Sequence, residues 1–286
     1  MLDSHVHLWD LAVRDQAWIP AGSPLRRSFD VGDLRGALAG TPVDCVILVQ
    51  ASNDAGETTD LISCARREGL VRGVVGWADL RSPGFAAALA ALAATGQLLG
   101  LRHQALAEAD PAGWLRSPAV RRGLAALETA GLPFDLMIRP AHFPAALQAA
   151  RDHPSLQFVL DHLGKPPIAS GELEPWAAGI RALAAEPNVA CKLSGLQTIA
   201  SADWTYAERA PYLDIALDAF GPARLIFGSD WPVCLSAASY SRVCEVAQVA
   251  CSGLSGPERA AMLAENARAI YRARCPPANR PILYES

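Results

Sequence analysis

Eight short apolar segments recur along the chain, and helical patterns separate them. Most of these segments are almost continuously apolar, which is typical of strands that are buried on both faces of a parallel sheet. Repeated alternation of such strands with helices is typical of a (β/α)8 barrel, and a length of 286 residues fits one barrel. The segments are residues 2–8, 45–51, 73–80, 98–103, 134–139, 156–162, 189–194 and 224–230.

The fold class predicted from this pattern is α/β, with a single TIM barrel domain spanning residues 1–286. A doubly wound open sheet is the alternative, but it usually has fewer strands and a G-x-G-x-x-G turn after the first strand, which this sequence lacks. The helices are clearest where apolar residues recur at helical spacing or where glycine and proline mark the ends. These helices are predicted at residues 58–68, 118–130, 211–220 and 257–274.

Composition narrows the classes of partner. Hydrophobic residues make up 51% of the chain and charged residues 19%, so the sequence can bury a large core. The net charge of -4 and the lack of a Lys/Arg cluster argue against nucleic-acid binding. The longest apolar run, residues 85–94, is too short to cross a bilayer, which needs about 20 residues. We therefore expect neither nucleic acid nor membrane as a partner, while monomer and homodimer both stay open.

Cysteine usage and the N-terminal residues indicate a compartment. The seven cysteines are scattered without a C-x-x-C pair, which indicates reduced thiols rather than a disulfide framework. The first residues lack the basic and apolar regions of a signal peptide. Both observations predict a cytoplasmic protein. Lys165 and Lys192 are the only lysines, which we interpret as a bias toward arginine.

Histidines gather where a barrel of this kind has its active site, at the C-terminal ends of the strands. Five of the six histidines fall at or just past the predicted strand ends, and only His153 does not. His5 and His7 are two residues apart on the first strand, so both side chains point to the same face. They can therefore converge on one metal ion or on one substrate oxygen.

Carboxylates accompany these histidines. Asp230, at the end of the eighth strand, is the candidate general base that takes a proton from an attacking water. Asp161 and His162 are adjacent on the sixth strand, so only one of them is expected to face the barrel mouth. We expect that residue to be His162, because an imidazole can polarise a carbonyl group or bind a metal. Asp161 is expected to bond to backbone or to hold a neighbouring arginine.

Cations and aromatic residues at the strand ends are candidates for substrate contact. Arg102 and Arg139 can bind a carboxylate or an oxyanion through paired N–H groups. Lys192 lies in the middle of the seventh strand, where a buried ammonium needs a partner, so it has either a site role or a salt bridge. Trp77 either packs or offers its face to a sugar ring. The long segment 14–33 is a candidate lid.

Six motifs resemble those of the amidohydrolase superfamily, and within it the amidohydrolase 2 branch of TIM-barrel lactonases. They are most similar to the sugar lactonases of the L-fuconolactonase and L-rhamnonolactonase group, and together they extend over nearly the whole chain. The motifs are residues 3–9 (DSHVHLW), 76–80 (GWADL), 101–104 (LRHQ), 160–166 (LDHLGKP), 191–196 (CKLSGL) and 227–234 (FGSDWPVC).

The resemblance implies roles for the matching residues. His5, His7 and His162 would line the site, and Asp230 would activate water. These four residues are also the implied ligands of one divalent metal ion, with zinc the first choice. Some lactonases of this branch are thought to work without a metal, so that alternative stays open.

The end of the fourth strand departs from the pattern of dinuclear amidohydrolases. Those enzymes have a bridging lysine or glutamate there, whereas this chain has Arg102, His103 and Gln104. We therefore expect at most one tightly bound ion. The resemblance also implies that Arg102 and His103 contact substrate.

The predicted function is hydrolysis of a small lactone, most simply a sugar-acid (aldono) lactone, through attack of water assisted by Asp230. The oxyanion would be stabilised by the site histidines and Arg102, or by a metal ion that some of them hold. An aromatic dicarboxylate lactone hydrolase or a related decarboxylase on the same fold is the alternative enzyme. A non-catalytic sugar-acid binding barrel is the third reading. The expected substrate contacts are Arg102, His103, Trp77, Arg139 and Lys192.

Overall fold

The computed structural model describes residues 1–200 and 205–274. Eight parallel strands lie side by side in chain order, each paired with the next, and the predicted (β/α)8 barrel is confirmed. Each of the eight predicted apolar segments overlaps one of these strands, although β3 begins two residues before the predicted segment 73–80. The strands are β1 (Leu2–Val6), β2 (Cys45–Val49), β3 (Val71–Gly76), β4 (Leu98–His103), β5 (Phe134–Leu136), β6 (Phe158–Leu160), β7 (Val189–Leu193) and β8 (Leu225–Phe227).

The ring closes between the end of β1 and the residues that follow β8. Val6 forms a parallel bridge with Trp231. The amide of His7 donates to the carbonyl of Trp231 at 2.7 Å, and the amide of Asp230 donates to the carbonyl of His5 at 2.9 Å. This closure places the His-x-His segment directly beside Asp230.

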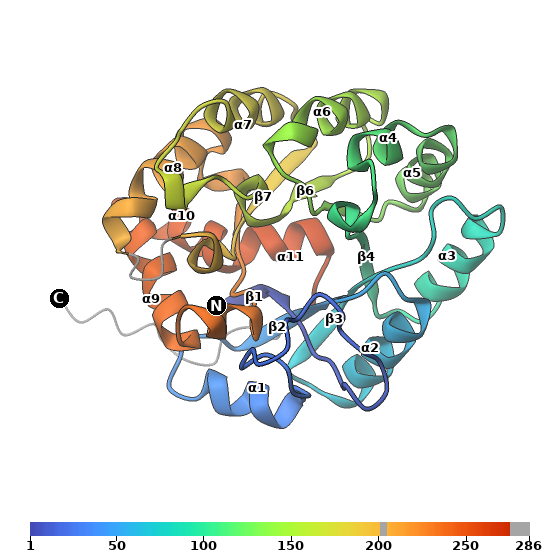
Figure 1. Ribbon diagram of the computed structural model, residues 1–286, viewed down its shortest axis with the longest axis horizontal. Helices are drawn as coiled ribbons and strands as arrows, with labels where there is room; N and C mark the ends of the chain where they lie inside the picture. Colours follow the sequence, from blue (N-terminus) through green and yellow to red (C-terminus); the bar gives the residue numbers. More distant parts are fainter. Residues whose placement is uncertain (201–204, 275–286) are drawn as a thin grey trace.

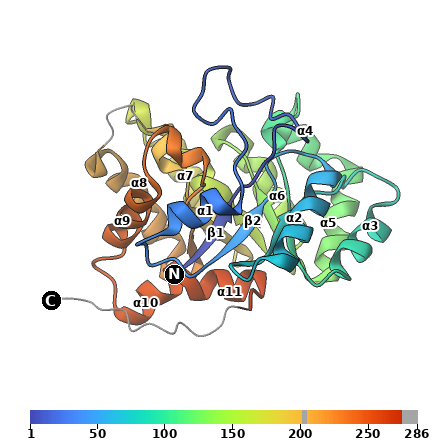
Figure 2. The ribbon, with the colours of Figure 1, turned by 90° about the horizontal axis from the view of Figure 1, so that it is seen from below.

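Helices surround the strands as an outer ring, which Figure 1 shows in a view along the barrel. Figure 2 shows the segment before α1 rising above one end of the barrel, while α10 and α11 lie at the opposite end. None of the helices in residues 1–200 and 205–274 is long and apolar enough to cross a membrane. The helices are α1 (Val31–Leu38), α2 (Ala55–Arg67), α3 (Phe85–Ala93), α4 (Pro111–Arg116), α5 (Pro118–Ala130), α6 (Phe143–Asp152), α7 (Trp176–Ala184), α8 (Tyr206–Phe220), α9 (Tyr240–Ala250), α10 (Gly256–Ala260) and α11 (Asn266–Tyr271).

Several predicted boundaries differ from the structure. The sixth and eighth segments, predicted to remain strands through His162 and Asp230, leave the sheet after Leu160 and Phe227. The helix predicted to start at Pro211 begins at Tyr206 instead. Thr205 and Glu208 form a capping box that starts α8 earlier, so Pro211 lies inside the helix rather than in its first turn.

The carboxylate of Asp3 stabilises the closure from inside. One oxygen accepts the amides of His5 at 3.0 Å and Ser229 at 2.8 Å, so it connects β1 to the segment after β8. The other oxygen accepts the hydroxyl of Tyr240 on α9 at 2.7 Å. Asp3 and Tyr240 are both buried, so water cannot replace this hydroxyl.

Substituting Tyr240→Phe should therefore destabilise the protein by about 1–3 kcal/mol, because it leaves a buried carboxylate oxygen without its donor. Urea unfolding followed by circular dichroism measures this loss. Tyr212→Phe is the matched control, since its hydroxyl bonds to part-buried backbone carbonyls that water can reach. An equal loss in both variants would contradict the role given to Asp3.

Candidate active site

A cavity of about 320 Å³ opens at the C-terminal ends of the strands. Its floor is made by polar residues that follow β1, β4, β6 and β8, and its rim by residues of the connecting loops. Trp18, in the long segment between β1 and α1, reaches it from above and is 43% exposed. The lining residues are His7, Trp18, Ala51, Arg102, Gln104, Leu106, Ala107, Met137, Arg139, His162, Lys165, Thr198, Asp230 and Val233.

Asp230 and the two histidines of β1 form the centre of the site. Asp230 Oδ1 lies 3.3 Å from His7 Nε2 and 3.7 Å from His5 Nε2. The rings of His5 and His7 meet edge to face, with centroids 4.9 Å apart. The convergence predicted from the His-x-His spacing is therefore present, although the two rings stand at different depths, with His5 completely buried behind His7.

His162 reaches the cavity through an unusual turn after β6. His162, Leu163 and Lys165 all have positive φ, at 54°, 51° and 54°. Residues other than glycine rarely adopt this conformation, and it is concentrated at functional sites. Only His162 of the adjacent pair lines the cavity, as expected, although it reaches the cavity through this turn and not from a continuous strand. His162 Nδ1 lies 2.8 Å from Ser194 Oγ, which orients the ring.

Asp161 lies under the histidines, between two cations. Arg102 Nη1 donates to its Oδ2 at 3.2 Å, and Lys192 Nζ lies 3.1 Å from its Oδ1. Lys192 also pairs with Asp135 on β5. His5 Nδ1 is 3.4 Å from Asp161 Oδ1, so the network supports the buried imidazole. The prediction that Asp161 holds a neighbouring arginine is confirmed.

The charge states of the central groups follow from this packing. Burial lowers the pKa of His162 to about 4, and it also holds the pKa of His5 well below its usual value. Burial alone would raise the pKa of Asp230, but the nearby His162, His7 and His5 outweigh it and hold that pKa well below its usual range. At neutral pH the site therefore presents an ionised Asp230 beside the neutral imidazoles of His5 and His162.

The five expected substrate contacts divide into two groups. Arg102 and Arg139 line the cavity, whereas Trp77, His103 and Lys192 lie outside its wall. His103 is buried, accepts Trp77 Nε1 at 2.9 Å and stacks on Trp114, so it braces the end of β4. Lys192 is completely buried in the ion network. Of the two alternatives predicted for it, a site role or a salt bridge, the structure shows the salt bridge.

Nine cavity residues were not among our site candidates, and four of them have polar atoms in their side chains: Trp18, Gln104, Thr198 and Lys165. Gln104 Nε2 donates to the carbonyl of Ala51, which fixes it against β2. A sequence signal existed for Lys165, because it lies in the motif of residues 160–166 and is one of two lysines. That signal could not give its direction, which depends on the left-handed turn.

The donor set at the centre fits one metal ion. His7 Nδ1 lies 2.8 Å from the carbonyl of Val49, to which it must donate, so in the neutral ring His7 Nε2 carries the lone pair. That lone pair faces a carboxylate oxygen at 3.3 Å, an arrangement that requires a proton or a cation between the two atoms. His5, His7 and Asp230 offer ligand atoms within 4.8 Å of one another, and imidazole with carboxylate suits zinc.

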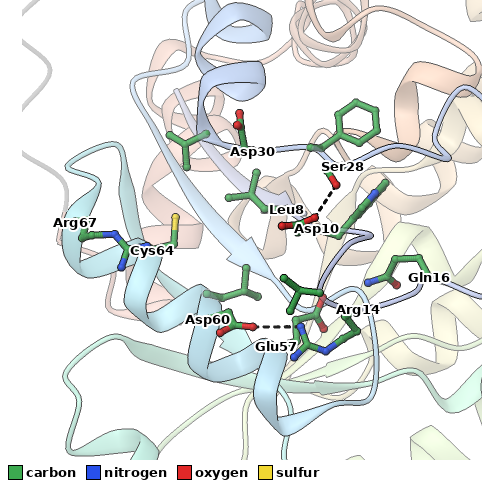
Figure 3. A pocket seen from close by; sticks show the side chains of 15 residues that line it. Leu8, Asp10, Arg14, Gln16, Ser28, Asp30, Glu57, Asp60, Cys64 and Arg67 are labelled. Atoms are coloured by element: carbon green, nitrogen blue, oxygen red, sulfur yellow. Dashed lines mark hydrogen bonds and ion pairs between the residues drawn. The ribbon is translucent and has the colours of Figure 1, made fainter.

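A second cavity, of about 440 Å³, lies between the segment before α1 and helix α2 (Figure 3). Arg14 crosses it to Asp60, and Asp10 accepts a hydrogen bond from Ser28. None of the histidines described above lines this cavity. The candidate catalytic residues therefore lie at the barrel mouth and not in this second cavity.

A barrel with two histidines on β1 and an aspartate after β8 defines the class of amidohydrolases. The amidohydrolase model Amidohydro_2 matches residues 2–273, and the chain belongs to this family. The predicted resemblance is confirmed. Two relatives named L-fucono-1,5-lactonase are 38% identical in Burkholderia ambifaria and 39% in Burkholderia multivorans, over 95% and 94% of this chain and 95% of each relative.

Solved structures that resemble this chain include a member described as an amidohydrolase. An amidohydrolase from Burkholderia multivorans with bound zinc is 38% identical, with a TM-score of 0.89 over 96% of this chain and 99% of that one. A protein described as a putative 2-pyrone-4,6-dicarboxylic acid hydrolase from Pseudomonas putida is 26% identical, with a TM-score of 0.77 over 95% of this chain and 97% of that one.

A substitution at Gly195 tests how closely the site is packed. Its φ is 64°, and an added Cβ would lie 2.7 Å from His162 Nδ1 and 3.0 Å from Asp230 Oδ2. Gly195→Ala should therefore lower kcat at least 10-fold by displacing these groups, in addition to a strain of about 1 kcal/mol. Activity assays and thermal unfolding measure the two effects.

Gly171→Ala is the matched control for this substitution. Its φ is 72°, but nothing lies within 4 Å of an added Cβ. It should show the strain and keep full activity. Equal activity in the two variants would show that His162 and Asp230 tolerate displacement.

Proposed function

We propose that the protein is a lactonase that hydrolyses a sugar-acid lactone to the open acid. The observation that carries this proposal is the ionised Asp230 facing His7 and His162 in a cavity sized for a small molecule, in a chain 38–39% identical to proteins named L-fucono-1,5-lactonase. L-Fucono-1,5-lactone is accordingly the first substrate to test.

Asp230 is the proton acceptor in this mechanism. Water beside its carboxylate attacks the ring carbonyl carbon and gives up a proton, and the C–O ring bond then breaks. Asp230 returns the proton to the departing ring oxygen, so the product is a hydroxy acid. The low pKa of Asp230 makes it a weak base, so most of the barrier lowering must come from stabilisation of the oxyanion.

Arg102 and His162 both line the cavity, and their side chains can stabilise that oxyanion. Arg102 is fixed by Asp161 and by the carbonyl of Gln50, so its guanidinium needs no reorganisation during the reaction. His162, held by Ser194, stays neutral and can offer a ring N–H. Trp18, from the segment between β1 and α1, also lines this cavity.

One divalent ion, with zinc the first choice, would be held by His5, His7 and Asp230, with His162 as the remaining candidate ligand. When bound, such an ion polarises a carbonyl and lowers the pKa of a coordinated water.

Asp230→Asn should reduce kcat for L-fucono-1,5-lactone by about 10²–10⁴-fold, because the amide cannot accept the proton. Asparagine tolerates the φ of 60° at this position, so the fold should persist. A pH-indicator hydrolysis assay measures the loss. Asp214→Asn, an exposed carboxylate on α8, should retain wild-type activity. An active Asp230→Asn enzyme would refute the mechanism, and a wild type inactive on all aldonolactones would refute the substrate class.

Metal content is a separate prediction. Protein stripped with a chelator and reloaded with zinc should bind one ion per chain, measured by elemental mass spectrometry after gel filtration. His7→Gln should lower zinc affinity at least 10-fold. His153→Gln, whose histidine bonds Glu128 away from the cluster, should bind as the wild type does. A reloaded wild type without stoichiometric zinc that still hydrolyses lactone would favour the metal-independent alternative.

A lactone that carries its own carboxylate is the second candidate substrate. Its recognition needs more cations at the barrel mouth than Arg102 and Arg139, and Lys165 supplies a third. A screen of neutral against acidic lactones separates the two candidates.

A further inference from the structure

The wall of the catalytic cavity holds more positive charge than its own carboxylates balance. Among the described residues that line it, Arg102, Arg139 and Lys165 are cations and Asp230 is the one carboxylate. Arg102 is neutralised by Asp161 beneath the wall. Arg139 and Lys165 have no carboxylate within 4.0 Å in the part of the chain that the structure describes. Two cations therefore face the cavity without a counter-charge of their own.

The backbone at Lys165 adopts a strained, left-handed conformation. Lys165 ends the left-handed turn that starts at His162, and its amide donates to the His162 carbonyl at 2.9 Å. Four of the five non-glycine residues with positive φ in residues 1–200 and 205–274 belong to the site: His162, Leu163, Lys165 and Asp230. The same strained turn thus presents the imidazole and the ammonium to one cavity.

A purely structural role does not explain this lysine. Its ammonium donates no hydrogen bond among the described residues, although the side chain is only partly exposed. An ammonium without a hydrogen-bond acceptor among the described residues, on the wall of a cavity that it shares with Arg139 and Arg102, is positioned to take an anionic ligand.

We propose that Lys165 and Arg139 form a carboxylate subsite of the catalytic cavity, distinct from the Arg102 position beneath it. The proposal deepens the function proposed above and rests on it for the origin of the carboxylate. A neutral sugar lactone carries no charge, but its hydrolysis product is a carboxylate. The ligand carboxylate is therefore either that of the open-acid product or one that the lactone already carries.

Titration calorimetry tests the subsite without turnover. The ligands are L-fuconate, the dicarboxylate galactarate and uncharged L-fucose as a control for contacts to hydroxyl groups. Lys165→Met keeps the length of the side chain and the same backbone strain while it removes the charge. Arg139→Gln removes the second cation. Arg122→Met, an exposed arginine on the outer helix α5, controls for net charge.

Lys165→Met and Arg139→Gln should each weaken L-fuconate binding about 10- to 100-fold, the usual worth of a charged hydrogen-bond partner. Binding of L-fucose should be unchanged in both variants, and Arg122→Met should bind all three ligands as the wild type does. Lys165→Arg should restore most of the L-fuconate affinity. The proposal is overturned if both charge-removing variants bind L-fuconate and galactarate within about 2-fold of the wild type.

Kinetics identify the source of the carboxylate. If it is the product's, Lys165→Met should raise the product inhibition constant for L-fuconate about 10-fold while KM for L-fucono-1,5-lactone changes little. If the lactone carries it, the wild type should prefer a glucarolactone over L-fucono-1,5-lactone at least 10-fold, and Lys165→Met should lose that preference. A wild type that opens no lactone refutes the proposed function, whereas the calorimetric result still decides the subsite.

Discussion

Asp161 is the group on which the charge balance of the barrel interior depends. It lies completely buried between Arg102 and Lys192, and Lys192 also reaches Asp135. A buried ion costs several kcal/mol unless a partner compensates it, so none of these four groups can be removed without stranding another. His5 Nδ1 lies 3.4 Å from Asp161 Oδ1. The ion pairs that stabilise the core therefore also fix the position of His5.

The network extends from the site to the far end of the barrel. Tyr271, on α11 at that end, donates its hydroxyl to Asp135 at 2.8 Å. The C-terminal helix therefore contributes to the support of a site at the other end of the strands, through Asp135, Lys192 and Asp161. Closure of the barrel at Asp3 and the ion network are two separate ways in which distant segments fix the same few side chains.

Much of this arrangement could be predicted from the sequence, because it follows from strand periodicity. The spacing of His5 and His7, and their position at the end of the first strand, placed them beside Asp230 once a barrel was assumed. The apolar segments located all eight strands for the same reason. Lys192 could be expected to need a partner because an unpaired buried ammonium is too costly, but its partners come from strands that the sequence does not align.

The features that were missed depend on backbone conformation outside regular strands. A left-handed turn at His162, Leu163 and Lys165 has no periodic signature, so nothing in the sequence could show that Lys165 points into the same cavity as His162. The same holds for Trp18, which reaches the cavity from a loop whose path is set by pairing of Trp9 with Phe29. The expected substrate contacts His103, implied by the family resemblance, and Trp77, taken from its strand end, lie outside the cavity wall and bond to each other.

The scarcity of lysine has a practical consequence. The chain has two lysines in all, and only Lys165 lines the catalytic cavity. Lys192 is sealed in the ion network. Reagents that acylate lysine side chains would therefore react at Lys165, inside the catalytic cavity. Attachment of this protein to a resin or a dye through its lysines would block the cavity instead of modifying the outer helices.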